Sequence, residues 1–246
     1  MLQRKLQPLV EKCGTVNLII PVYNEEAILE TQLEPVLKQL PEGFSVTVVE
    51  NGSTDETISI LNAMKVNNSG LKVIHISEPS YGNAVREGLE SSTADILMVD
   101  DLDVLDTDFW VAGLGIMVEG STDMIQGSKI LAGKNDRRPF LRRAATRVLT
   151  SLLRLLLGFK GTDTHGPKIM RRSSMASIFP QCGNEPDLYP SELIIRAQRM
   201  GLVIRELPIK LEEIRETPLA LHKRVPRAIR DLFLLRAKLG KSPERS

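Results

Sequence analysis

Short apolar runs alternate with amphipathic stretches through the first hundred residues of the chain. Four runs have the length and composition of buried strands: residues 16–21, 45–50, 71–76 and 95–100. Between them, apolar side chains recur every three or four residues, which predicts helices, the first between Ile28 and Leu40. This alternation predicts an α/β fold with a doubly wound, mostly parallel central sheet and helices on both faces.

Polar residues after the strands predict how the following helices begin. Asn24 is expected to cap the first helix, and Ser53 or Thr54 is expected to cap the second. The stretch from Tyr81 to Ala84 is expected to open a third helix, in a turn whose backbone amides can approach a sugar or a diphosphate.

The composition is that of a globular protein, with 246 residues, of which 42% are hydrophobic and 26% charged. The net charge of +1 favours no class of partner. Cys13 and Cys182 lack metal-site spacing and are expected to be free thiols in a reducing compartment. Because no signal peptide and no apolar run of transmembrane length is present, a cytoplasmic protein is expected. The expected organisation is a polar lead-in (1–14), one α/β domain (15–215) and a basic amphipathic helix with a tail (216–246).

Carboxylates cluster where the fourth predicted strand ends: Asp100, Asp101, Asp103 and Asp106. Ligands bind at this edge of an open α/β sheet, and clustered carboxylates favour a hard divalent cation that carries a phosphorylated ligand. Asp101 and Asp103 are the favoured pair, because alternate residues leaving a strand can point into one site. The alternative interpretation is a solvated acidic loop that caps the next helix.

Two further polar stretches, residues 21–25 and 50–53, follow predicted strands and should lie at the same edge. No Gly-x-Gly-x-x-Gly follows the first strand, and no phosphate-binding P-loop is present, which disfavours an ordinary dinucleotide fold and a P-loop ATPase. A nucleotide is therefore expected to be held by an aromatic side chain and carboxylates, with its diphosphate bridged through metal.

Together, four stretches of the first half resemble family 2 glycosyltransferases with the nucleotide-sugar (GT-A) fold: residues 21–25, 50–55, 81–88 and 101–103. The second half resembles the branch that transfers mannose or glucose to dolichyl or other polyprenyl phosphates: residues 127–129, 162–164, 168–172, 191–197 and 201–209. The resemblance implies inverting, metal-dependent transfer of a hexose from a nucleoside diphosphate sugar of the GDP-mannose or UDP-glucose type. It implies a polyprenyl phosphate acceptor at the cytoplasmic membrane face.

The resemblance also implies roles for individual residues. The nucleotide-binding residues would be Pro21, Tyr23, Glu25, Glu50, Asn51 and Asp101. Asp101 and Asp103 match the metal and nucleotide-sugar motif, with Mg²⁺ or Mn²⁺ as the implied cofactor. The acceptor phosphate would be met by Lys129, Arg142, Arg143 and Lys168.

Other residues have two interpretations each. His165 can complete the metal shell or only form hydrogen bonds within its loop. A phosphate acceptor is already an anion near neutral pH and needs no general base, whereas a hydroxyl acceptor does. Asp163, Glu192 and Asp187 are then the candidate catalytic bases, although Asp163 can equally be a buried partner of an arginine.

The sequence departs from the family pattern at several positions. Asn51 stands where an aspartate is usual, Lys129 where an arginine is common, and His165 where the branch usually has a glutamine. Two alternative functions therefore stay open: transfer to a soluble or glycan hydroxyl acceptor, and a catalytically silent nucleotide-sugar-binding protein.

Two segments, residues 139–158 and 219–240, combine a leucine-rich face with many arginines and lysines. Such segments either pack on the core with a solvated basic face or lie on an anionic membrane surface. Nucleic acid is disfavoured as a partner, because the basic residues lack interleaved aromatics and no nucleic-acid-binding motif is present.

Overall fold

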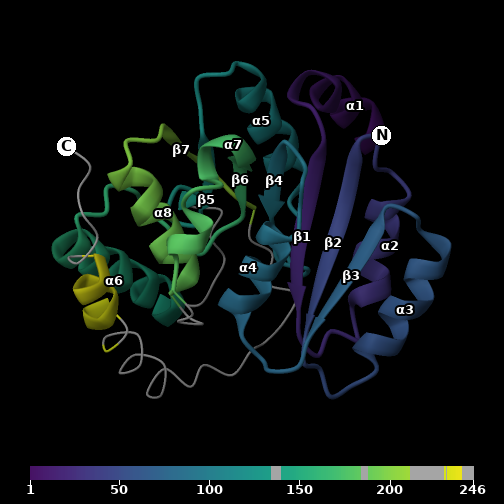
Figure 1. The fold of residues 1–246 in the computed structure, drawn as a ribbon, viewed down its shortest axis with the longest axis horizontal. Coiled ribbons are helices and arrows are strands. Elements are labelled where there is room, and N and C mark those ends of the chain that lie inside the picture. Colours follow the sequence, from purple (N-terminus) through teal and green to yellow (C-terminus); the bar gives the residue numbers. More distant parts are fainter. Residues whose placement is uncertain (134–139, 184–187, 211–229, 231, 240–246) are drawn as a thin grey trace.

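The computed structural model describes residues 1–133, 140–183, 188–210, 230 and 232–239. Its strands form one sheet in the order β3-β2-β1-β4-β6-β5-β7 (Figure 1). The strands are β1 (Val16–Val22), β2 (Phe44–Asn51), β3 (Leu71–Ile76), β4 (Ile96–Val99), β5 (Met124–Ser128), β6 (Lys168–Arg171) and β7 (Ile204–Pro208). Every strand pair is parallel except those of β6, which runs antiparallel to β4 and β5. The predicted mostly parallel sheet is confirmed.

Helices cover both faces of the sheet (Figure 1). They are α1 (Leu2–Cys13), α2 (Leu29–Leu37), α3 (Thr57–Asn67), α4 (Tyr81–Glu90), α5 (Thr107–Val118), α6 (Phe140–Leu157), α7 (Arg172–Met175) and α8 (Tyr189–Arg199), with a short 3-10 helix at Phe179–Gln181. Side chains alternate across β4, so that Met98 lies in the core with α1, α2, α3 and α5. Leu97 lies in the opposite core with α4, α6 and α8.

Residues 1–14, expected to be a polar lead-in, instead contain helix α1. Leu6 and Val10, four residues apart on one helical face, are buried in the same core as α5. The helix ends at Gly14, whose φ of 88° suits a residue without a Cβ atom. The polar composition concealed a narrow apolar stripe, and this segment is part of the folded domain.

The predicted helix caps at Asn24 and at Ser53 or Thr54 are wrong. Helix α2 begins after Ile28 and α3 after Glu56, without a side-chain cap at either position. Instead, Asn24 Oδ1 accepts a hydrogen bond from Thr54 N at 2.8 Å, and Asn24 N donates to Ser53 Oγ at 3.0 Å. These polar residues join the loop after β1 to the loop after β2.

Most of the predicted C-terminal amphipathic segment lies outside the described residues. Within it, residues 232–239 are helical. Leu232, Leu235 and Leu239 are buried in the core that also holds Leu153 and Leu157 of α6, which fits the core-packing interpretation for this stretch. None of the helices in the described part of the chain combines the length and hydropathy of a membrane-spanning segment.

Candidate functional site

The topology places a switch point, where the strand order reverses, at the carboxyl ends of β1 and β4. The chain passes from β1 through α2 to β2 on one side, whereas α4 returns it to β4 on the other side of β1. In open α/β sheets this reversal of strand order is where ligands bind. Because β1, β2 and β4 are parallel, the stretches that follow them meet at one edge, as the sequence predicted.

Asp100 organises the turn after β4 from a buried position. Its carboxylate accepts hydrogen bonds from Trp110 Nε1 at 2.7 Å, Asp101 N at 2.9 Å and Asp106 N at 3.1 Å. Burial, together with the charge of Asp101, raises the pKa of Asp100 well above its ordinary value, although the bond from Trp110 opposes this. Asp100 therefore has a structural role.

Asp106 has the capping role that was the alternative interpretation of the acidic cluster. Its Oδ1 accepts a hydrogen bond from Phe109 N at 3.0 Å at the start of α5. Its Oδ2 accepts a second bond from Lys210 N at 2.8 Å. Asp101 and Asp103 differ from these two residues in being partly exposed.

Tyr81 lies beside Asp101 and Asp103, in a region of concentrated negative charge. Its hydroxyl donates a hydrogen bond to Asp101 Oδ1 at 3.0 Å. Burial raises the pKa of Tyr81 well above its ordinary value, and the charges of Asp101, Asp100 and Asp103 raise it further. A bound cation would offset this negative field.

The donor set suits the implied Mg²⁺ or Mn²⁺. Hard cations prefer carboxylate oxygens, and Mg²⁺ in phosphate-transferring sites is held by one or two carboxylates plus substrate phosphates. Asp101 and Asp103 fit this description. The described residues contain no group of three or more His, Cys, Asp or Glu side chains that could hold a metal, so the structure does not bring His165 together with the two aspartates.

His165 instead takes part in the hydrogen bonds of its own loop. Its Nδ1 lies 2.9 Å from Thr164 Oγ1, and its backbone N donates to Asp163 Oδ1 at 2.9 Å. These contacts fit the loop interpretation of this histidine.

The residues expected to hold the nucleoside differ in accessibility. Tyr23 is 43% exposed directly after β1, where its ring can stack on a base or ribose. Glu25 is partly buried, and its backbone N donates to Thr57 Oγ1 at 2.8 Å. Pro21 is buried within β1 and shapes the strand end.

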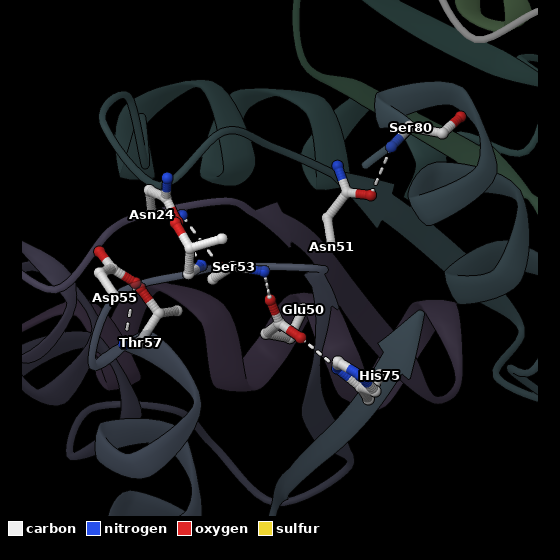
Figure 2. Close-up of polar contacts among 9 residues, drawn as sticks. Asn24, Glu50, Asn51, Ser53, Asp55, Thr57, His75 and Ser80 are labelled. Carbon is white, nitrogen blue, oxygen red and sulfur yellow. Dashed lines mark hydrogen bonds and ion pairs between the residues drawn. The ribbon is translucent and has the colours of Figure 1, made fainter. Parts of the chain in front are cut away.

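Glu50 and Asn51, at the end of β2, are engaged with neighbouring loops (Figure 2). Ser53 N donates to one oxygen of Glu50, and His75 Nδ1 contacts the other. Burial alone would raise the pKa of Glu50, but the hydrogen bonds from Ser53 and His75 outweigh it and hold this pKa below its ordinary value. Asn51 Oδ1 accepts a bond from Ser80 N at 2.6 Å, which fixes the start of α4.

His75 was not recognised from the sequence. No signal in the sequence identifies it, because its contact with Glu50 follows from the register in which β2 and β3 pair in parallel.

Asp163 connects the loop after α6 to the end of β5. Its Oδ2 accepts a hydrogen bond from Lys129 N at 3.0 Å, and its Oδ1 bonds His165 N. Burial raises its pKa, but the charge of Lys129 and these bonds lower it more, so that the pKa lies below its ordinary value. The contacts of Asp163 therefore fit its interpretation as the buried partner of a cation, here Lys129 rather than an arginine.

Glu206 on β7 also holds this loop and was not singled out from the sequence. Its Oε1 accepts a bond from Thr162 N at 2.6 Å, and its Oε2 accepts one from Thr162 Oγ1 at 2.9 Å.

Lys168 is buried on β6 and is not placed to meet an acceptor phosphate. Its Nζ donates to Thr164 O at 2.9 Å and to Gly166 O at 2.8 Å. Burial lowers its pKa to about 8, although the charges of Asp163 and Asp101 oppose this shift. Lys129 is partly exposed and is the better placed cation of the two.

Glu192, the second candidate base, is buried in α8 with both carboxylate oxygens engaged, and the third candidate, Asp187, lies outside the described residues. Glu192 Oε1 pairs with the Arg196 guanidinium, with Nη2 at 2.6 Å, and its Oε2 accepts a bond from Gly183 N at 2.9 Å. This pair stabilises the helix and the preceding loop. Arg143 is partly buried on α6, whereas the side chain of Arg142 lies outside the described residues.

The buried position of Lys168 predicts an alkaline rise in stability. Its pKa is about 8 in the folded chain and 10.5 in the unfolded one, so between these values the unfolded chain binds more protons. The free energy of unfolding should therefore rise from pH 8 to pH 10.5, by at most about 3 kcal/mol relative to Lys168→Met. Urea denaturation across this range checks the prediction, with Lys65→Met on the exposed face of α3 as the control. Equal pH profiles for wild type and Lys168→Met would contradict it.

The comparisons with known proteins agree with this geometry. Residues 17–179 match the family described as Glycosyl transferase family 2. The chain therefore belongs to glycosyltransferase family 2, and its enzyme class is that of the glycosyltransferases.

The chain is 26% identical over 208 residues to glycosyltransferase AglD of Haloferax volcanii, which covers 80% of this chain and 33% of that protein. It is 24% identical over 248 residues to dolichyl-phosphate beta-glucosyltransferase of Saccharomyces cerevisiae. This match covers 90% of this chain and 74% of the yeast protein. It thus spans about a third of AglD and most of the yeast protein. The yeast relative, whose name includes dolichyl phosphate, is consistent with the resemblance to the polyprenyl-phosphate branch.

A solved structure confirms the GT-A fold. Glucosyl-3-phosphoglycerate synthase of Mycobacterium tuberculosis, in complex with Mn²⁺, UDP and phosphoglyceric acid, matches with a TM-score of 0.65. The identity is 20%, and the match covers 96% of this chain and 81% of that one.

Proposed function

We propose that the chain transfers a hexose from a nucleoside diphosphate sugar to a phosphate monoester, with inversion at the anomeric carbon. The observation that carries the proposal is the partly exposed pair Asp101 and Asp103 at the switch point between β1 and β4, where the Tyr81 hydroxyl donates a hydrogen bond to Asp101. These two residues would hold Mg²⁺ or Mn²⁺, which when bound neutralises charge on the departing diphosphate. Tyr23 and the residues at the end of β2 would bind the nucleoside.

The burial and hydrogen bonding of the candidate bases favour a phosphate acceptor over a hydroxyl acceptor. Within the described residues, both Asp163 and Glu192 are buried with both carboxylate oxygens engaged in hydrogen bonds. A phosphate monoester has a second pKa of about 6 and is already a nucleophilic anion near neutral pH. It needs positioning and charge compensation, which Lys129 and Arg143 would supply.

The surface of α6 favours a lipid-linked phosphate. Val148 is 59% exposed and Leu155 is 80% exposed. With Arg147, Ser151 and Leu152 they line a shallow pocket of about 280 Å³. Exposed apolar side chains beside arginine suit a prenyl chain at an anionic membrane. We therefore propose a polyprenyl phosphate as the acceptor. The printed name of the yeast relative, which includes dolichyl phosphate, supports this choice.

A panel of ligands tests the proposal. UDP, GDP and their hexose conjugates should raise the melting temperature by several degrees for the correct nucleotide, and only when Mn²⁺ is present. Hexose should then pass from the stabilising donor to dolichyl phosphate in vesicles. No stabilisation by any nucleotide would overturn the proposal.

Control acceptors separate the alternatives. Transfer to 3-phosphoglycerate alone would assign a soluble acceptor, and the position of the new bond, on its phosphate or on its hydroxyl, would show which group reacts. Transfer to a glycan would assign a hydroxyl acceptor. Stabilisation without transfer, and without slow metal-dependent hydrolysis of the donor, would identify a silent nucleotide-sugar-binding protein.

A further inference from the structure

Glu50 on β2 and His75 on β3 form a pair near the carboxyl ends of these strands, at the edge of the sheet where the nucleoside is proposed to bind (Figure 2). They lie opposite each other in the parallel register of β2 and β3, one strand beyond β1. The two side chains differ in accessibility, because that of Glu50 is 1% exposed and that of His75 is 54% exposed. A base that approaches this end of the edge therefore meets the imidazole before the carboxylate.

The hydrogen bonds of Glu50 determine which nitrogen of His75 carries the proton. An ionised carboxylate only accepts hydrogen bonds, so the His75 nitrogen that contacts it, Nδ1, must be the donor. In the neutral ring this leaves Nε2 as an acceptor. Ser53 N holds the second oxygen of Glu50 and so prevents the carboxylate from turning away. Among the described residues, Nε2 has no hydrogen-bond partner.

We infer that His75 contacts the nucleobase of the donor through Nε2, and that Glu50 is a positioning residue that fixes the tautomer of His75. This inference rests on the proposed function and moves base recognition away from Glu50, the residue that the family resemblance implied. An acceptor nitrogen selects bases with a ring N–H on their pairing edge. Uracil and guanine have this N–H, whereas cytosine and adenine have an unprotonated ring nitrogen there.

The arrangement also predicts what a reversed tautomer would do. In Glu50→Gln the amide oxygen can still accept from Ser53 N, which leaves the amide NH₂ toward His75. Nδ1 would then accept a hydrogen bond, and Nε2 would carry the proton. A donor at Nε2 selects the opposite bases, so that the preference should shift toward cytosine or adenine. Exchange of a carboxylate for its amide is a known way to hold a histidine in the wrong tautomer.

Calorimetric titration with Mn²⁺ tests the inference with two matched pairs, UDP against CDP and GDP against ADP. Pyrophosphate serves as the ligand without a base. The wild-type chain should prefer UDP or GDP over its matched partner by about tenfold or more, since an unmatched polar pair is costly. His75→Ala should remove that preference and leave pyrophosphate affinity unchanged. Glu50→Gln should reverse the preference.

His75→Asn is the control for a purely structural role. Its amide keeps a donor for Glu50 but lacks an equivalent of Nε2, so it should retain wild-type stability and still lose base discrimination. Equal loss of affinity for every ligand, or unchanged discrimination in His75→Ala, would overturn the inference while leaving the proposed function intact. Failure of the wild-type chain to bind any of the four nucleotides would overturn the proposed function itself.

Discussion

Asp103→Asn should lower the rate of hexose transfer by about a thousandfold or more. The amide keeps the size of the side chain but removes one of the two carboxylates that would bind the cation and thus the diphosphate. A thousandfold loss corresponds to about 4 kcal/mol of transition-state stabilisation, a size expected when Lewis-acid assistance is lost. Initial rates at saturating donor, measured over a range of Mn²⁺ concentrations, check this result.

Glu119→Gln is the matched control for the loss of a carboxylate. Glu119 follows the C-terminus of α5, at the opposite end of this helix from Asp103, and pairs with Arg205 at 3.3 Å in an exposed position. Its variant should retain the wild-type rate, since exposed ion pairs contribute little. An Asp103→Asn enzyme with wild-type rate and metal requirement would contradict the assignment of the metal site.

The fold followed from the sequence because β1, β2 and β4 are buried on both faces. Such strands are continuous apolar runs, and the strand-helix alternation leaves few topologies. Helix α1 was missed for the opposite reason. Only Leu6 and Val10 of its residues are buried, and a stripe that narrow is hidden by the polar residues around it.

The sequence could suggest a group of site residues only where they lie close together at the end of one strand. Asp101 and Asp103 are separated by a single residue and could be recognised as a pair. The state of Glu192 depends on Arg196 and on Gly183, and nothing in the sequence shows that both of its oxygens are occupied. The contact between Glu50 and His75 depends on register between two strands, which the sequence does not reveal.

Gly166→Ala should destabilise the chain by at least about 3 kcal/mol, because the added carbon has no space. A Cβ atom at this position would lie 2.0 Å from the carbonyl oxygen of Gly127 and 2.8 Å from its carbon. These are backbone atoms of β5, so no side chain can rotate to relieve the overlap. The carbonyl of Gly166 also accepts bonds from Lys168 Nζ and, at 3.2 Å, from Gln126 Nε2, so that a shift of the loop would break both.

Gly115→Ala is the control for this substitution. Gly115 lies inside α5 with nothing within 4 Å of the added carbon, and alanine there should stabilise the chain by about 0.5–1 kcal/mol. Thermal unfolding should show opposite shifts, a loss of about 6 °C or more for Gly166→Ala and a gain of a few degrees for Gly115→Ala. If the two variants melted together, the loop would not be packed against β5 as closely as the structure shows. Asp163, which this loop carries, would then not be held in place to accept the hydrogen bond from Lys129 N.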